Sequence, residues 1–522
     1  MKRCIMFIFY TSLLCTLFGQ TKIHVHRSDA VDIRLFTSLL DSINFQALQE
    51  KPSEYSTLTL HKNNQTTQVV PLQAVDSIEF GVDQSEYIFD ITALPEIKLT
   101  VKLKDWNDLL NYYDINNSNE ECVPASIEFK KNGVATQLDS IGIRIRGNSS
   151  RRRPEGGEGD MHNATNPSWH HAHFALKFAE YKKGQSMYST DRFNLKWFKD
   201  DAMYCREIYC YDLFKRFGVW TAPRASYARL TIYVEGDAQP AYFGVYSIIE
   251  AVNDDYLKYR VLQGKFTDHN GNLWKAGYGA DLSSMDDSKM GVENITLNPS
   301  TMQTYVYDLK TNKKNGLAAA KVQLKNFVNE MSSLPSGSAE LKTFLEQKMD
   351  VDLFLRAYAV NVMVGMWDDY WFNKNNFYFY FDTNGKFYFI PYDYDNTLGT
   401  SSGMNSGTQD MLNWGALDDS RLFMKKIMSI TAFKNQYKAY IKELANANND
   451  LFDTNKSIAR IQQWHAMIGN YIVNDTKEDM LIEDKPASWG NAGFYRLFTG
   501  DDKGGNAGDA NFFKTKIKSI TW

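Results

Sequence analysis

The sequence contains few of the residues that build disulfide-rich or zinc-ribbon proteins. It has five cysteines in 522 residues, and after residue 19 only Cys122, Cys205 and Cys210 remain. Their spacing forms neither a disulfide framework nor a Cys-x-x-Cys pair. Gly-x-Ser-x-Gly and Walker-type phosphate loops are also absent from the sequence. We therefore expect three buried free thiols and a fold that a hydrophobic core stabilises.

An excess of charge of one sign is missing too. The 58 Lys and Arg residues nearly balance the 62 Asp and Glu residues, which leaves a formal net charge of −4. This balance gives no electrostatic reason to expect nucleic acid or an anionic membrane as a partner. Beyond the N-terminus no apolar run approaches the length of a bilayer span, so we predict no transmembrane span.

The N-terminus has the layout of a secretory signal peptide over residues 1–19. Lys2 and Arg3 precede an apolar run over residues 4–18, and Gly19 then offers a small residue. We predict an exported protein that is periplasmic, surface-bound or secreted. A lipid anchor on Cys15 is the alternative, although the bulky Leu14 before it fits lipoprotein cleavage badly.

Residues 20–81 contain an internal repeat. Ile23-His-Val-His-Arg-Ser returns 35 positions later as Leu58-Thr-Leu-His-Lys-Asn, and Leu40-Asp-Ser-Ile-Asn-Phe45 returns as Val75-Asp-Ser-Ile-Glu-Phe80. Each copy predicts a strand, a polar turn and a short closing strand. We expect a small β repeat module.

Histidines gather in two places. The first group, in the repeat module, is His24, His26 and His61; the second, in a polar loop, is His162, His170, His171 and His173. Alternating strand positions favour a solvated face over a metal site for the first group. The second group has no spaced partner motif and favours a flexible loop.

The rest of the chain predicts an α+β fold with sheets first and helices later. We expect a linker over residues 82–96, a main domain over 97–475 and a C-terminal extension packed on it over 476–522. The expected strands are 124–130, 137–146, 173–178, 193–198, 225–234 and 241–249. The expected helices are 200–217, 350–366, 421–444 and 458–472. The turn Lys131-Asn-Gly133 predicts a hairpin.

An aromatic hairpin between Trp367 and Gly399 carries the strongest chemical signal. Phe377–Phe381 and residues 386–390 are expected strands, joined by the turn Asp382-Thr-Asn-Gly385. A hairpin returns its ends to one place, so Asn376 and Asp393 should lie together, with Asp368 just upstream. A carboxylate, an amide and a second carboxylate in this order suit phosphoryl transfer with a bound Mg²⁺.

Further charged residues suit phosphate and metal. Asp395 lies two positions after Asp393, and neighbouring carboxylates repel each other unless a cation neutralises them. Arg144 and Arg146 alternate along a strand, share one face and can clamp phosphate.

Several motifs, in order along the chain, resemble those of the spore-coat CotH kinase family. They are Ile143-Arg-Ile-Arg-Gly-Asn-Ser-Ser-Arg151, Phe174-Ala-Leu-Lys-Phe178, Phe193-Asn-Leu-Lys196, Arg206-Glu207, Phe243-Gly-Val-Tyr246 with Glu250, Gly271-Asn-Leu-Trp-Lys275, Asn376-Phe-Tyr378 and Ile390-Pro-Tyr-Asp-Tyr-Asp-Asn-Thr-Leu-Gly399. The resemblance covers about residues 95–475 and implies an atypical protein-kinase-like domain.

The resemblance implies roles for individual residues. Asp368 is the implied catalytic carboxylate, with Asp369 as the alternative. Asn376 and Asp393 are the implied metal ligands, although Asn373 stands at the usual five-residue spacing from Asp368 whereas Asn376 stands at eight. The phosphate lysine is Lys177 or Lys196, paired with Glu207 or Glu250, and Lys275 is a third candidate.

The function that follows is an exported atypical protein kinase. It would use ATP with Mg²⁺ (or Mn²⁺) to phosphorylate Ser or Thr hydroxyls of an extracytoplasmic protein. The alternative is a catalytically inactive CotH-like surface binding protein or adhesin on the same fold. A glycosidase with Asp368 and Asp393 as paired carboxylates is a further alternative.

Overall fold

The computed structural model describes residues 19–47, 55–147, 150–283, 285–293, 304–400, 403–472, 482 and 512–522. The expected signal peptide and Cys15 lie outside these residues, apart from Gly19. The chain divides into two compact units. The N-terminal unit holds the described residues up to Asp90 together with Ser186–Asp191 and Val252–Asn270, and the main unit holds the rest.

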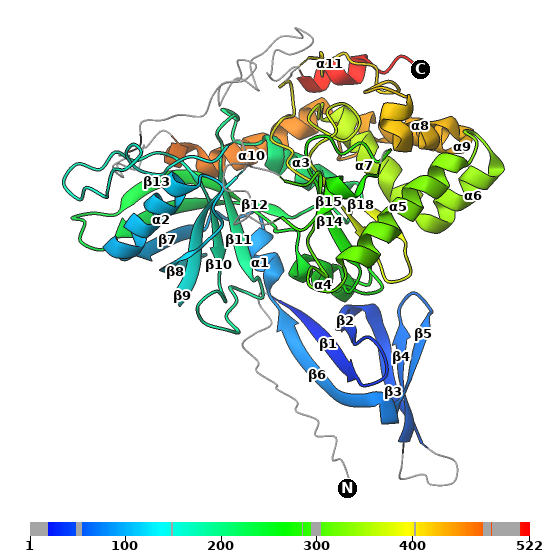
Figure 1. The fold of residues 1–522 in the computed structure, drawn as a ribbon, viewed down its shortest axis with the longest axis horizontal. Helices are drawn as coiled ribbons and strands as arrows, with labels where there is room; N and C mark the ends of the chain where they lie inside the picture. Colours follow the sequence, from blue (N-terminus) through cyan, green and yellow to red (C-terminus); the bar gives the residue numbers. More distant parts are fainter. Residues whose placement is uncertain are drawn as a thin grey trace. The chain divides into compact units, whose positions relative to one another are not determined.

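The 35-residue repeat folds into six strands in two three-stranded sheets (Figure 1). The strands are β1 Gln20–Arg27, β2 Ile33–Phe36, β3 Leu40–Ala47, β4 Tyr55–Lys62, β5 Thr67–Pro71 and β6 Val75–Asp83, with 3-10 turns η1 Thr37–Leu39 and η2 Leu72–Ala74. The closing strand of each copy pairs with the first strand of the other copy, β3 with β4 and β6 with β1. The two copies therefore depend on each other for pairing.

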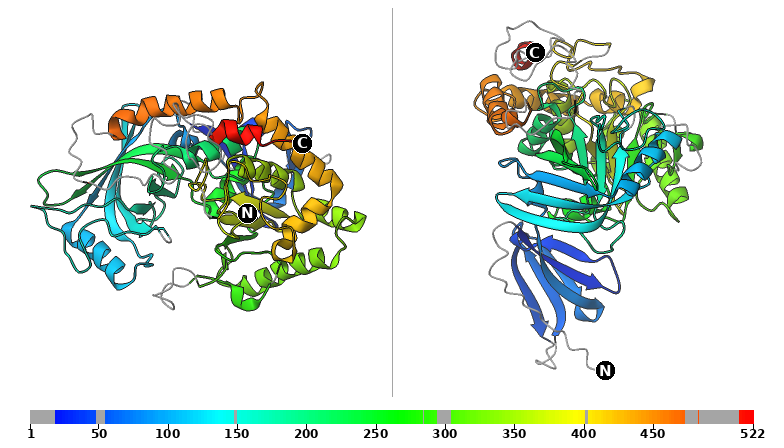
Figure 2. Two further views of the ribbon diagram at one scale, coloured as in Figure 1. Left: turned by 90° about the horizontal axis from the view of Figure 1, so that it is seen from above. Right: turned by 90° about the vertical axis from the view of Figure 1, so that its left-hand side faces the viewer.

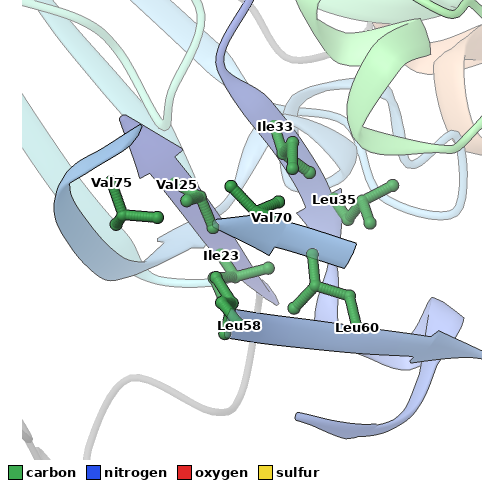
Figure 3. Close-up of a cluster of buried hydrophobic side chains, with 8 residues drawn as sticks. All are labelled: Ile23, Val25, Ile33, Leu35, Leu58, Leu60, Val70 and Val75. Carbon is green, nitrogen blue, oxygen red and sulfur yellow. The ribbon is translucent and has the colours of Figure 1, made fainter. Parts of the chain in front are cut away.

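One hydrophobic core joins the two sheets of this unit. Figure 3 shows its buried members: Ile23, Val25, Ile33, Leu35, Leu58, Leu60, Val70 and Val75. Because side chains alternate along a strand, every second residue of β1 and β4 points into this core and the others point away. This alternation explains why a short repeat folds as a sandwich.

The expected linker over 82–96 contains a helix, α1 Ser85–Phe89. Tyr87, Ile88 and Phe89 are buried, and the Tyr259 hydroxyl of α4 (Asp254–Leu262) donates to the Glu86 carboxylate at 2.5 Å. One helical turn is too short to show helical periodicity, which is why the sequence pattern indicated only a linker.

The first half of the main unit is a closed seven-stranded barrel in the order β10-β11-β13-β12-β7-β8-β9. Its strands are β7 Glu96–Val101, β8 Val123–Lys131, β9 Val134–Arg146, β10 His173–Lys177, β11 Arg192–Trp197, β12 Ala225–Val234 and β13 Ala241–Ile249, with helices α2 Leu103–Ile115 and α3 Arg206–Arg216. The expected hairpin turn is confirmed, because Asn132 and Gly133 both have positive φ between β8 and β9.

The second half is a five-stranded sheet covered by helices (Figures 1 and 2). Its strands are β14 Asn272–Ala276, β15 Met290–Gly291, β16 Tyr307–Leu309, β17 Phe377–Phe381 and β18 Phe387–Pro391. The helices of this half are α5 Leu317–Ser333, α6 Ala339–Lys348, α7 Val351–Met363, α8 Leu422–Ser429 and α9 Thr431–Ala445, with short turns η3 Asp287–Lys289 and η4 Asp419–Arg421. Two further helices follow, α10 Thr454–Ile472, which packs against β13 of the barrel, and α11 Phe512–Lys518. The α+β class is thus confirmed.

Two expected helices differ from the observed ones for local reasons. The helix expected over 200–217 begins only at Arg206, because the Asp201 carboxylate accepts the backbone N–H groups of Cys205 and Arg206 as a cap. The helix expected over 421–444 is two helices, α8 and α9, because Ile430 between them has extended backbone angles.

The described part of the C-terminal extension packs on the main unit. The ring of Phe513 in α11 contacts the rings of Tyr209 and Phe452, and the Lys516 ammonium donates to the Ser406 carbonyl at 2.9 Å. No helix among the described residues has the length and apolarity needed to cross a bilayer. Cys122, Cys205 and Cys210 are free and buried, as expected.

His162 lies in a buried ionic network rather than in a flexible loop. Its two ring nitrogens lie 2.9 Å from the Glu155 carboxylate and 2.7 Å from the Asp237 carboxylate, and Trp106 donates its indole N–H to Glu155. Burial opposes the charged ring, but the hydrogen bonds to Glu155 and Asp237 outweigh burial and raise the pKa of His162. The ion pairs of His162 with Glu155 and Asp237 therefore fix this part of the loop.

Replacing Leu60 by Ala should destabilise the N-terminal unit by about 2–5 kcal/mol, because Leu60 is fully buried in the core between the two sheets. Val69→Ala, at a 57% exposed position of the same sheet, is the control and should change stability by less than about 0.5 kcal/mol. Hydrogen exchange of the β4 and β5 amides measures both. Equal effects would contradict the described core.

The His162 network should make stability depend on pH. A histidine whose pKa is raised by folding stabilises the folded protein. Its contribution is complete at a pH below the ordinary pKa of about 6.5 and is lost as the pH rises through the raised pKa. The difference in unfolding free energy between wild type and His162→Gln should therefore shrink from pH 6 to pH 9. Asp237→Asn should reduce the same slope, and a pH-independent difference would contradict the network.

Candidate active site

The hairpin of β17 and β18 brings two polar residues to one end. Phe377 pairs with Pro391, so Asn376 precedes one strand where Asp393 follows the other. Both residues have positive φ, 54° for Asn376 and 65° for Asp393. Asn and Asp tolerate this backbone region better than most residues, and such strained positions gather at functional sites.

Lys196 meets this end of the hairpin from the barrel. Its ammonium on β11 lies 2.7 Å from Glu207 of α3, 2.6 Å from Asp393 and 3.3 Å from Asp395. Burial would lower the pKa of Lys196, but Asp393, Asp395 and Glu207 outweigh burial and raise it well above its ordinary value. One buried ammonium thus joins a strand, a helix and the hairpin.

Three carboxylates around one ammonium leave excess negative charge. Burial, with Asp393 and Glu207 nearby, raises the pKa of Asp395 well above its usual range; burial raises that of Glu207 too. Lys196 holds the pKa of Asp393 below its ordinary value against the effect of burial. Oxygen ligands with surplus charge are the set that a hard divalent cation such as Mg²⁺ prefers. The residues therefore fit a metal at Asp393 and Asp395.

Tyr211 connects the helix to the hairpin, and sequence reasoning missed it. Its hydroxyl donates to Glu207 at 3.2 Å and accepts the backbone N–H of Asp393 at 3.0 Å. Tyr211 stands four residues after Glu207, on the same face of α3, which is the one signal that could have identified it. Glu207 and Asp393 are thereby held at fixed positions.

Asp368 is enclosed by asparagine side chains. The amides of Asn373, Asn375 and Asn376 all donate to its carboxylate, the last at 2.9 Å. Burial, together with the charge of Asp393, raises the pKa of Asp368 although the three amides oppose this. The loop of eight residues thus folds back on Asp368 and brings both Asn373 and Asn376 to it.

Asp369 has a different environment. It is buried and accepts hydrogen bonds from the Asn361 amide at 2.7 Å and from the Phe372 backbone N–H at 2.8 Å. Burial raises the pKa of Asp369 to about 7. These bonds tie the loop to α7, so the geometry favours Asp368 over Asp369 as the residue that could reach a substrate.

Basic residues lie near Glu120 and Asp393. The Arg146 guanidinium donates to the Tyr392 hydroxyl at 3.1 Å, and Arg144 lies 3.3 Å from Glu120 with its Nε making no hydrogen bond among the described residues. Burial opposes ionisation of Glu120, but Arg144, Lys310, Arg151 and Lys275 outweigh burial and lower its pKa to about 2. Burial and Lys310 lower the pKa of Lys275 itself. This side of the site has a positive field that suits phosphate oxygens.

The structure separates the other candidates from the site. Lys177 pairs with Glu180 at 3.1 Å, and Glu250 pairs with Arg224 at 2.7 Å. The sequence left open which lysine pairs with which glutamate, and the geometry joins Lys196 with Glu207. Asn148 and Ser149 of the Gly147 loop lie outside the described residues.

Comparison with known proteins places the sequence in a family. A family model described as "CotH kinase protein" matches residues 143–496. Among curated proteins of Rhizopus delemar, Spore coat protein homolog 1 is 21% identical over 373 residues, covering 69% of this chain and 52% of that protein. Invasin CotH3 and Invasin CotH2 are each 24% identical, over 48% and 47% of this chain and 37% of either protein.

The chain thus spans about half or less of the length of these relatives. Their names describe a spore coat protein homolog and invasins. The family model, by contrast, spans more than half of this chain and includes the candidate catalytic, metal-binding and phosphate-binding residues from Arg144 to Asp395. This chain therefore belongs to the CotH kinase protein family.

Proposed function

We propose that this chain is an exported protein kinase that transfers the γ-phosphate of ATP to Ser or Thr hydroxyls of an extracytoplasmic protein, with Mg²⁺ or Mn²⁺. The observation that carries this proposal is the contact of Lys196 with both Glu207 and Asp393. A strand lysine paired with a helix glutamate, beside an aspartate that follows a hairpin, is the arrangement with which protein kinases hold phosphates and metal.

Asp393, Asp395 and Asn376 would hold the divalent cation. The side-chain N–H of Asn376 donates to the Asp368 carboxylate, which leaves the side-chain carbonyl oxygen of Asn376 available to bind the metal. When bound, the cation neutralises negative charge on the phosphate oxygens. Lys196, kept in place by Glu207, would bind the phosphates directly, and Arg144 and Lys275 would add positive charge beside it.

Asp368 would receive the proton of the acceptor. The Ser or Thr oxygen attacks the γ-phosphorus, the bond between this phosphorus and the departing ADP oxygen breaks, and the hydroxyl proton passes to the Asp368 carboxylate. The raised pKa of Asp368 makes it a better proton acceptor than an exposed aspartate. The three asparagine amides keep this carboxylate oriented.

The second candidate function is a surface binding protein without transfer activity. The observation that favours it is that two of the matching relatives carry the name invasin. A binding protein needs the same fold but no catalytic function of Asp368 or Asp393, so measurements of phosphate transfer separate the two candidates.

Asp393→Asn and Asp368→Asn should each lower phosphate transfer by about 10²–10⁴-fold, because the first weakens the metal site and the second removes the proton acceptor. The measurement is incorporation of label from γ-radiolabelled ATP, with Mg²⁺ or Mn²⁺, into the chain or an added acceptor protein. Asp419→Asn is the control, since Asp419 pairs with Lys425 on a surface turn.

Transfer that survives both site variants would refute the assigned site. Absence of label in the wild type as well would refute the kinase proposal and favour the binding protein.

Lys196→Met and Lys177→Met form a matched pair on neighbouring strands. Lys196→Met should reduce transfer at least about 100-fold, because Glu207 and Asp393 lose the ammonium that joins them. Lys177→Met should leave transfer within about twofold, because its described partner is Glu180. Initial rates at saturating ATP test both, and the reverse order would identify Lys177 as the phosphate lysine.

A further inference from the structure

The outer face of β1 in the N-terminal unit carries two neighbouring histidines. Ile23 and Val25 point into the core of the sandwich (Figure 3), so His24 and His26 lie on the opposite face. Their ring centroids are 3.7 Å apart. Two imidazoles this close place several ring nitrogens within reach of one ion.

Two carboxylates approach the same rings. Asp32, just before β2, lies 2.7 Å from His24 Nε2 and 3.3 Å from His26 Nδ1. Glu79 stands opposite His24 in the register of β1 and β6, and its carboxylate lies 3.4 Å from His26 Nε2. One ligand atom each from His24, His26 and Glu79 lie within 4.8 Å of one another.

The separation of His26 Nε2 from Glu79 matches a metal site better than a hydrogen bond. Ligands bound at about 2.1 Å to a tetrahedral ion stand about 3.4 Å apart, the separation of His26 Nε2 and Glu79. His26 Nε2 is shielded from solvent and makes no hydrogen bond among the described residues. His26 Nδ1 faces Asp32, and a carboxylate on the second ring nitrogen is the usual way to orient a ligating histidine.

Arg34 is the cation already beside this cluster. Its Nε lies 3.0 Å from His24 Nε2, which cannot at once accept from Arg34 and donate to Asp32. Arg34 also contacts His269 at 2.9 Å, so it has a partner other than His24. Asp32 and Glu79 together outnumber Arg34 in charge, which leaves the cluster net negative and favours a dication.

The second copy of the repeat provides an internal comparison. Positions 35 residues from His24, His26, Asp32 and Glu79 hold Thr59, His61, Thr67 and Asn44. Asn44 pairs with Thr59 as Glu79 pairs with His24, and Thr67 lies 3.3 Å from His61 Nδ1 as Asp32 does from His26. The same fold thus forms without the extra histidine and the two carboxylates, so the strands do not require them.

We propose that His24, His26 and Glu79 bind one zinc-class divalent cation, with Asp32 orienting the His26 ring. Two imidazoles and a carboxylate are a ligand set for Zn²⁺ rather than for the harder Mg²⁺. The ion would join β1 to β6, one of the two strand pairs through which the repeat copies pair. This site is independent of the proposed kinase centre.

The test is a Zn²⁺ titration of the full chain after dialysis against a chelator, followed by calorimetry, with Co²⁺ absorption as a probe of tetrahedral geometry. An Asp393→Asn background removes the proposed kinase metal site. One tight zinc site is expected. His26→Ala and Glu79→Gln should each weaken it more than about tenfold, and His61→Ala, the matched histidine of the second copy, should leave it unchanged.

Glu79→Gln is informative because the side chain of Glu79 is 67% exposed, so this change leaves the core intact. Equal zinc affinity in wild type, His26→Ala and Glu79→Gln would overturn the proposal. Absence of a tight zinc site in the wild type would overturn it as well, and equal loss in His61→Ala would assign the effect to the module rather than to this cluster.

Discussion

The ammonium of Lys196 is the charge on which the rest of the site depends. It is buried among Glu207, Asp393 and Asp395, which come from a helix and from the end of a hairpin. Removing one charge from such a buried cluster leaves the others unpaired, at a cost of several kcal/mol. The relative placement of β11, α3 and the β17–β18 hairpin is therefore tied to electrostatics as well as to packing.

Tyr211 and two residues with positive φ, Asn376 and Asp393, fix the positions of these charged groups. The Tyr211 hydroxyl spans Glu207 and the Asp393 backbone, and Asn376 and Asp393 hold backbone angles that most residues avoid. Asp369 fixes the loop through α7 while Asp368 stays with the asparagines. Adjacent aspartates thus differ in environment, because Asp369 is bonded to α7 and Asp368 to the asparagine amides.

The two repeat copies of the N-terminal unit share core positions but differ at outward positions. The two copies have the same pairing pattern and form one sandwich. At the outward positions they differ: Glu79 corresponds to Asn44, and Asp32 corresponds to Thr67. Core positions such as Ile23 and Leu58 stay apolar in both copies because burial constrains them. Outward positions are free of that constraint and can acquire chemistry.

The sequence by itself determined the local features: the repeat, the hairpin that joins Asn376 to Asp393, the Asn132-Gly133 turn and the order of family motifs. These depend on alternation and turn residues, which act over a few positions. Only the tertiary structure decided that Lys196 pairs with Glu207 while Glu250 takes Arg224, that Tyr211 belongs to the site, and that Asp32 and Glu79 meet His26. Those contacts depend on how separate strands, helices and loops pack against one another, and the spacing of residues along the sequence does not predict that packing.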